Sequence, residues 1–140
     1  MGRLLAVGPR RHALDVAVVA GGGYLGANGR YGISLLVPGT LEATLLVNVL
    51  GSFLLGALVY RRVVVGALSS RLRLLFGTGF LSSFTTYSTF VLDATSHPES
   101  AVPYVLASYA LGFGAVLLAR WILRRPATPG RGRNDGGDRE

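Results

Sequence analysis

Cysteine and lysine are both absent from this chain of 140 residues, and acidic residues are few. Without cysteine there is no disulfide framework, no thiolate metal site and no cysteine nucleophile. Charged residues make up only 15% of the chain, whereas a soluble domain normally has about 25%. The chain is 50% hydrophobic, which excludes a disordered basic protein. An apolar single domain whose net charge of +7 comes from arginine indicates a membrane protein.

Long segments with almost no charge run through the sequence. A helix needs about 20 apolar residues to cross a hydrocarbon core of about 30 Å. Three segments meet this requirement with charges only at their ends, and another near the N-terminus is interrupted only by Arg30. The pattern predicts an all-α integral membrane protein with four transmembrane helices, at 14–36, 43–60, 72–93 and 101–123. A soluble helical core is not expected because these segments are apolar all round.

The arginines flank the predicted helices in a one-sided pattern. All except Arg30 fall in the segment 1–13, between the second and third predicted helices, or toward the C-terminus. The positive-inside rule therefore places both termini in the cytoplasm, with the helices in the cell membrane. Residues 124–140, rich in Pro, Gly and Arg, are expected to form a disordered basic tail. Because the arginines border apolar segments, topology explains them, and no nucleic-acid binding is expected.

Serine and threonine crowd the middle of the third predicted helix. Most of residues 82–89 carry a hydroxyl, and Gly77 and Gly79 come just before them. Such hydroxyls compete with the hydrogen bonds of the helix, so we predict a break in this helix near the bilayer centre. Carbonyl groups freed at a break are tolerated where they are buried or face a cavity or an ion. Channels and transporters build ion sites in this way.

Asn48 is a polar residue in the middle of the second predicted helix. Its amide needs a hydrogen-bond partner in the membrane, and a helix–helix contact and a functional role both remain open. The pair Gly22 and Gly26 favours close helix packing. The acids near the predicted helices all lie at their ends: Asp15, Glu42, Asp93 and Glu99. With no nucleophile–base pair, enzyme activity is not expected.

Three motifs follow one another along the predicted helices. They are GGGYLGANGRY at 21–31, TLLVNVLGSF at 44–53 and GTGFLSSFTTYSTF at 77–90. Together they resemble the helix signatures of the Fluc (CrcB-type) fluoride channels, with a match that spans residues 14–123. The resemblance implies four-helix subunits that form antiparallel dimers with two narrow pores. Such channels pass fluoride passively and selectively, which lowers cytoplasmic fluoride.

The resemblance also implies site residues. The backbone carbonyls of Ser82 and Thr85 correspond to ligands of a structural Na⁺, and Arg30 to a vestibule arginine. The residues expected along the fluoride pathway are Asn48, Tyr87, Ser88, Thr89, Phe90, Tyr104 and Ser108. Amide and hydroxyl donors can replace the water around fluoride, and electropositive ring edges can contact an anion. Arg30 can raise the local anion concentration.

The sequence departs from the family pattern at the predicted break. Ser82 and Ser83 replace the usual Gly-Gly, which lowers backbone freedom. Tyr87 replaces a pore phenylalanine, and its hydroxyl adds a polar group that can obstruct or retune the pore.

The arginine pattern bears on assembly. An antiparallel homodimer needs the same chain inserted in both directions, which calls for balanced flanking charge. This chain is strongly unbalanced, so we hypothesise one orientation and a dimer with an oppositely inserted homologue. A non-conducting partner subunit of a heterodimeric fluoride channel is an alternative. A small multidrug-type transporter is a weaker one, because it needs a mid-helix Glu in the first helix and Asp15 lies at the end.

Overall fold

The computed structural model describes residues 9–65 and 69–124. Within these ranges the chain is helical and contains no strand. The elements are α1 (Pro9–Leu36), α2 (Thr40–Val65), α3 (Ser70–Arg73), η1 (Leu74–Leu81), α4 (Ser82–Phe84), α5 (Tyr87–Ser96) and α6 (Pro98–Leu123). The predictions for residues 1–8 and for the tail beyond Arg124 lie outside the described residues.

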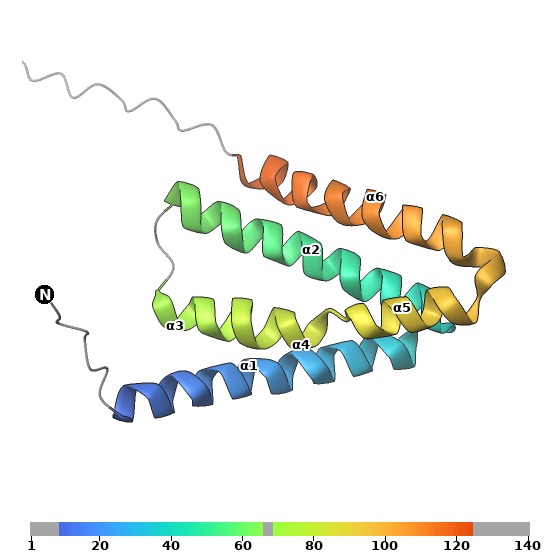
Figure 1. Ribbon diagram of the computed structural model, residues 1–140. Helices are drawn as coiled ribbons and strands as arrows, with labels where there is room; N and C mark the ends of the chain where they lie inside the picture. Colours follow the sequence, from blue (N-terminus) through green and yellow to red (C-terminus); the bar gives the residue numbers. More distant parts are fainter. Residues whose placement is uncertain (1–8, 66–68, 125–140) are drawn as a thin grey trace, which may run out of the picture.

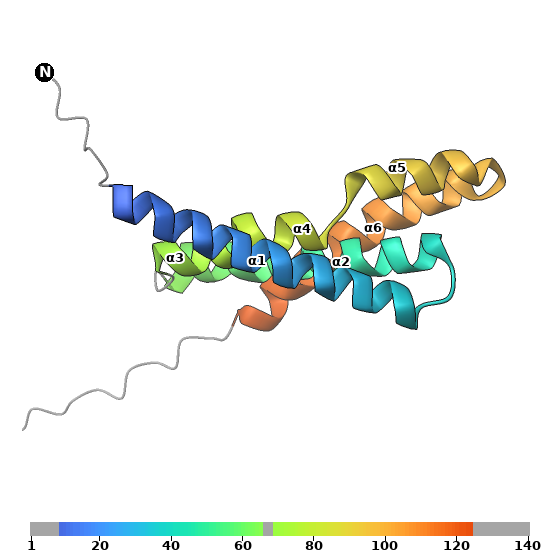
Figure 2. The same cartoon turned by 90° about the horizontal axis from the view of Figure 1, so that it is seen from below.

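The helices form an elongated antiparallel bundle (Figures 1 and 2). The run from α3 through η1 and α4 to α5 makes one passage along it, beside α1, α2 and α6. α2 packs mainly against α6, whereas α1 packs against η1 and α4. The start of α1, the end of α2, the start of α3 and the end of α6 share one end of the bundle (Figure 1).

Local sequence signals mark the turns between helices. Gly39 has a φ of +102°, a left-handed conformation that suits glycine, and it follows Pro38 in the turn between α1 and α2. The hydroxyl of Ser69 caps α3 by accepting a hydrogen bond from Leu72 N at 3.3 Å. Pro98 starts α6, where its missing N–H costs nothing.

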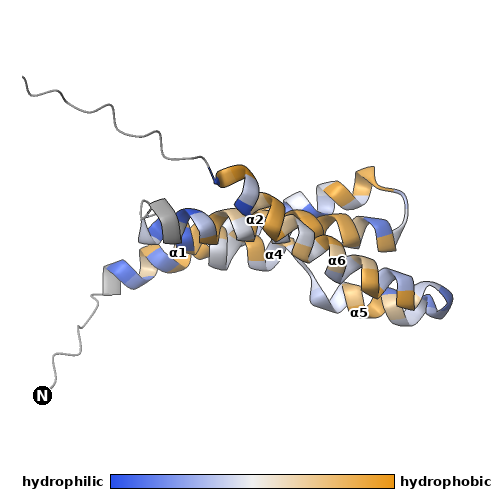
Figure 3. Cartoon of the chain, turned by 90° about the horizontal axis from the view of Figure 1, so that it is seen from above, coloured by the Kyte–Doolittle hydropathy of each residue, from blue (hydrophilic) through white to orange (hydrophobic). Residues whose placement is uncertain are grey.

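Among the residues that the structure describes, two helices have the length and composition to cross a membrane: Thr40–Arg61 within α2, and α6. α1 carries many glycines and Arg30, and the passage from α3 to α5 is divided into short elements. Figure 3 shows hydrophilic stretches mostly near the two ends of the bundle and hydrophobic stretches between them. Large apolar side chains such as Leu36, Phe113 and Trp121 are exposed, which suits a surface that faces lipid rather than water.

Glycine allows α1 to contact the third passage closely. Gly22 and Gly26 are both buried on the face of α1 that meets η1 and α4. A Cβ at Gly22 would overlap the carbonyl oxygen of Leu75, and one at Gly26 would overlap that of Phe80. The GxxxG pair therefore packs within the subunit. Across this contact, η1 is wound more widely than an α-helix.

Candidate ion pathway

The third passage is interrupted at two residues. Thr85 (φ −79°, ψ 155°) and Thr86 (φ −144°, ψ 119°) have extended backbone between α4 and α5. The amide of Thr85 still donates to Leu81 O at 3.0 Å, so the first helical part ends normally. The hydroxyl of Thr86 then accepts from Thr89 N at 3.2 Å and caps α5.

Asn48 on α2 pairs with the backbone exposed at this interruption. Its Nδ2 donates to Thr86 O at 3.1 Å, and its Oδ1 accepts from Thr86 N at 2.9 Å. This side-chain amide gives Thr86 N, which has no helical acceptor, the partner that a buried amide requires, and it adds a second donor to Thr86 O. The amide nitrogen carries two hydrogens, so one further donor remains on Asn48. Asn48 therefore makes a helix–helix contact and still lines a cavity.

Hydrogen bonds are diverted from two backbone carbonyls in this region. In a continuous helix, Thr86 N would donate to Ser82 O, and Thr89 N to Thr85 O. Here Thr86 N donates to Asn48 and Thr89 N donates to the Thr86 hydroxyl. The carbonyls of Ser82 and Thr85 are thus released from the helical ladder and can accept another donor or a cation.

A cavity of about 550 Å³ lies between α2, α6 and the third passage. It brings together six of the predicted site residues: Asn48, Ser82, Thr85, Tyr87, Phe90 and Ser108. Its wall also includes Tyr109 and Phe113, which the sequence analysis did not single out. Both lie close to Ser108 on α6, because Tyr109 is the next residue and Phe113 is little more than one turn farther on. This spacing is the feature of the sequence that could have identified them.

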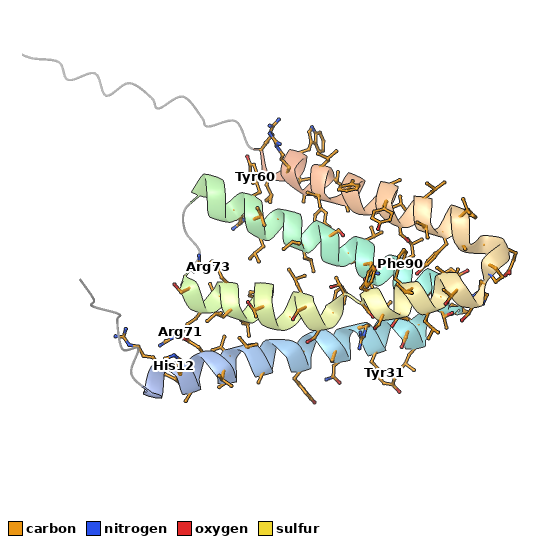
Figure 4. The ribbon with its side chains drawn as sticks, viewed as in Figure 1. His12, Tyr31, Tyr60, Arg71, Arg73 and Phe90 are labelled. Carbon is orange, nitrogen blue, oxygen red and sulfur yellow. The ribbon has the colours of Figure 1, made fainter. Side chains whose placement is uncertain are left out.

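Aromatic residues line part of this cavity, among them Phe90 (labelled in Figure 4), Tyr87 and Tyr109. The ring of Phe90 lies 6.0 Å from that of Tyr87 and 5.3 Å from that of Tyr104. Tyr109 meets it edge-on at 6.5 Å and 81°. Tyr87 is 76% exposed, so it stands at the outer rim. The cluster offers ring edges, which carry partial positive charge.

A second cavity, of about 300 Å³, lies between α1, α2 and α5. Arg30 lines it together with hydroxyl-bearing residues: Tyr31, Ser34, Thr40, Thr44, Thr86 and Thr89. No carboxylate lines it, so the charge of Arg30 is available to an anion. Thr86 is the one residue that lines both cavities. The Arg30 cavity and the aromatic cavity therefore adjoin one another at the interruption of the third passage.

Two residues predicted for the fluoride pathway, Ser88 and Tyr104, are not among those that line either cavity, and Ser108 uses its hydroxyl proton within α6. Ser88 is exposed, with its Oγ 3.4 Å from the Thr86 hydroxyl. Ser108 donates to Tyr104 O at 2.8 Å, so its lone pairs rather than its proton face the cavity. Tyr104 is 6% exposed and its hydroxyl has no partner.

Asp93 is a buried acid that the sequence analysis placed only at a helix end. It is 5% exposed, and its Oδ2 has no hydrogen-bond partner. Its depth depends on how α5 packs against α6, which no local pattern reveals.

Together these features define a class: a small helical membrane protein with two cavities, one lined by aromatic residues and one by Arg30 and hydroxyls, that meet at an interrupted helix. Comparison with known proteins narrows the class. The sequence model of the family described as CrcB-like protein, Camphor Resistance (CrcB) matches residues 17–120. The chain therefore belongs to the CrcB family, which confirms the resemblance inferred from the three motifs.

Several curated relatives carry the name of an ion channel. The protein of Haloarcula marismortui named "Fluoride-specific ion channel FluC 1" is 53% identical over 109 residues, which cover 78% of this chain and 85% of that protein. The protein of the same name from Natronomonas pharaonis is 51% identical over 111 residues, 78% of this chain and 93% of that protein. "Fluoride-specific ion channel FluC 2" of Halobacterium salinarum is 43% identical over 115 residues, 81% and 89% of the two chains.

Proposed function

We propose that this chain is a subunit of a fluoride-selective channel that lets fluoride leave the cytoplasm passively. The observation that carries the proposal is the 53% identity to a protein named as a fluoride-specific ion channel, over 85% of that protein's length. A passive channel needs no catalytic group, and the family is one of channels rather than enzymes. The protein acts in the cell membrane, with both termini in the cytoplasm.

The geometry supports a route for a small, strongly hydrated anion. Fluoride enters the cavity of Arg30, passes Thr86 and reaches the aromatic cavity. The remaining donor of Asn48 and the hydroxyls of Ser88 and Thr89 replace its water, with the ring edges of Phe90 beside them. The route also includes Tyr87, Tyr104 and Ser108. The proposed selectivity for fluoride rests on these donors, because they replace the water molecules that the ion loses in the pore.

A structural Na⁺ at the interrupted helix is part of the proposal. The carbonyls of Ser82 and Thr85 suit a cation because the amides that a helix would direct at them donate elsewhere. Within the described residues there is no group of three His, Cys, Asp or Glu side chains that could hold a metal ion, so backbone oxygens are the ligands to expect. A bound Na⁺ would offset the negative ends of these carbonyl dipoles. A second subunit related by a two-fold axis doubles the ligand set.

Assembly as an antiparallel dimer, with the third helix interrupted near the bilayer centre, is also proposed. The 550 Å³ cavity and the exposed ring of Tyr87 lie on an open flank that a second subunit can cover. The one-sided arginines favour an oppositely inserted homologue as that second subunit. Relatives numbered FluC 1 and FluC 2 are in keeping with pairs of such proteins.

Fluoride efflux from liposomes tests this function directly. The purified chain is reconstituted alone and then with a candidate partner, and external fluoride is followed with a selective electrode, with chloride as the control anion. Fluoride release without chloride release supports the channel. Release only with the partner assigns a heterodimer. If neither preparation releases fluoride, the channel proposal is wrong.

Tyr87 gives a reason to consider a non-conducting subunit as the second candidate. Its hydroxyl stands where the family has a phenylalanine, and its ring is at the rim of the aromatic cavity. In the mixed liposomes, a Tyr87→Phe variant separates the two cases. Faster efflux indicates a pore that this tyrosine obstructs, and unchanged efflux indicates that the partner's pore carries the ion.

A further inference from the structure

One end of the bundle gathers arginines from four helices. They are Arg11 on α1, Arg61 on α2, Arg71 and Arg73 on α3, and Arg120 on α6, with Arg124 directly after α6. The start of α1, the end of α2, the start of α3 and the end of α6 lie together at this end (Figure 1). The described acids Glu42, Asp93 and Glu99 belong to elements near the opposite end. Among the described acids, Asp15 lies one turn along α1 from Arg11.

Arg73 is the member of this group with an unmet bonding requirement. Its Nε is shielded from solvent and has no hydrogen-bond partner. A buried N–H without an acceptor is unfavourable. Figure 4 shows Arg73 on the side of α3 toward α2, and Arg71 between α3 and the start of α1, near His12. An anionic oxygen that reaches this end of α3 would satisfy the Nε of Arg73.

Aromatic side chains place these arginines at the depth of lipid headgroups. Trp121 is 73% exposed and follows Arg120, and Tyr60 precedes Arg61. Tyr60 is half-buried, and Trp and Tyr are enriched at the boundary between hydrocarbon and water. We therefore expect Arg61 and Arg120, one residue away, to lie at the depth of the headgroups.

We propose that this arginine-bearing end binds the phosphate group of an anionic phospholipid, with Arg73 as its central ligand. The planar guanidinium donates two parallel hydrogen bonds to phosphate, which lysine cannot do, and this chain uses no lysine at all. Basic pockets beside membrane helices bind such headgroups. The lipid would tie α3 to the ends of α2 and α6, and so hold the third passage that carries the interruption.

Lipid binding to the full-length protein in detergent tests the proposal. Phosphatidylglycerol or phosphatidylcholine is titrated, bound lipid is counted by native mass spectrometry, and thermal unfolding is followed in parallel. We expect phosphatidylglycerol alone to bind and raise the unfolding temperature. Arg73→Gln should weaken its binding about tenfold, as for a lost interaction of about 1.4 kcal/mol, and Arg73→Lys should weaken it less. Arg139→Gln removes the same charge outside the described residues and should have little effect.

Three results would overturn the proposal. Phosphatidylcholine, whose phosphate is offset by a quaternary ammonium, would bind equally well only if the net negative charge of the headgroup were not recognised. An Arg139→Gln variant as weak as Arg73→Gln shows a general charge effect. Inorganic phosphate that alone gives the full thermal shift shows a free-anion site. If Arg73→Gln does not fold, Arg71→Gln on the same helix takes its place, and unchanged binding counts against the proposal. None of these readings uses fluoride, so they leave the channel function untouched.

Discussion

Asn48 secures the interrupted helix at the scale of a single residue. Its side-chain amide donates a hydrogen bond to Thr86 O and accepts one from Thr86 N. Asn48→Leu removes both hydrogen bonds and leaves the buried Thr86 N without an acceptor, whereas Thr86 O keeps its helical donor at the start of α5. We expect a loss of about 1–3 kcal/mol in the free energy of unfolding for the orphaned amide, and loss of fluoride efflux. Thermal unfolding in detergent and liposome flux measure the two effects.

Ser52→Ala is the matched control for Asn48. The Ser52 hydroxyl lies one turn along α2 and donates to Asn48 O at 2.8 Å, inside its own helix. Its removal should cost less than about 1 kcal/mol, because that carbonyl keeps its helical partner. If Asn48→Leu is no less stable than Ser52→Ala, the amide does not hold the interruption. Asn48→Asp separates the two bonds, since an ionised carboxylate accepts from Thr86 N but cannot donate to Thr86 O.

Phe90 is the residue whose ring contacts the most aromatic neighbours in the larger cavity. Phe90→Ile keeps apolar volume but removes the electropositive ring edges. We expect fluoride efflux to fall about tenfold or more, for a lost interaction of about 1.4 kcal/mol, while stability changes by less than about 1.5 kcal/mol. Phe76→Ile, in η1 and 6.4 Å from Phe80, is the control and should leave efflux unchanged. Equal efflux from both variants would remove Phe90 from the pathway.

At the scale of the element, α1 and the third passage depend on glycine for their close contact. Gly26→Ala puts a Cβ onto the carbonyl of Phe80, and backbone cannot yield as a side-chain tip can. We expect a loss of about 1–3 kcal/mol in the free energy of unfolding, as for overpacking. Gly21→Ala on the same helix meets nothing within 4 Å, and should be neutral or stabilising by up to about 1 kcal/mol. Thermal unfolding compares them, and equal values would contradict the packing.

The sequence predicts elements better than it predicts pairings. Charge-free runs located the helices, although α2 continues to Val65 and α1 begins at Pro9. Hydroxyl density pointed to residues 82–89, where Thr85 and Thr86 have extended backbone. The partner of Asn48 was not predictable, because Thr86 is 38 residues away and meets it only through the packing of helices. The burial of Asp93 was missed for the same reason, since a helix end in the sequence is a buried position in the bundle.

At the scale of the whole molecule, charge is divided between the two ends of the bundle, and the absence of cysteine makes its orientation measurable. The arginines favour one insertion, with the end of α2 and the start of α3 in the cytoplasm. Ser70→Cys, at that end, and Ser96→Cys, at the end of α5, are exposed serines on opposite ends. An impermeant thiol reagent on intact cells should label Ser96→Cys and spare Ser70→Cys until the membrane is opened. Equal labelling of both variants would mean that the chain inserts in both directions, and a homodimer would then need no second gene product.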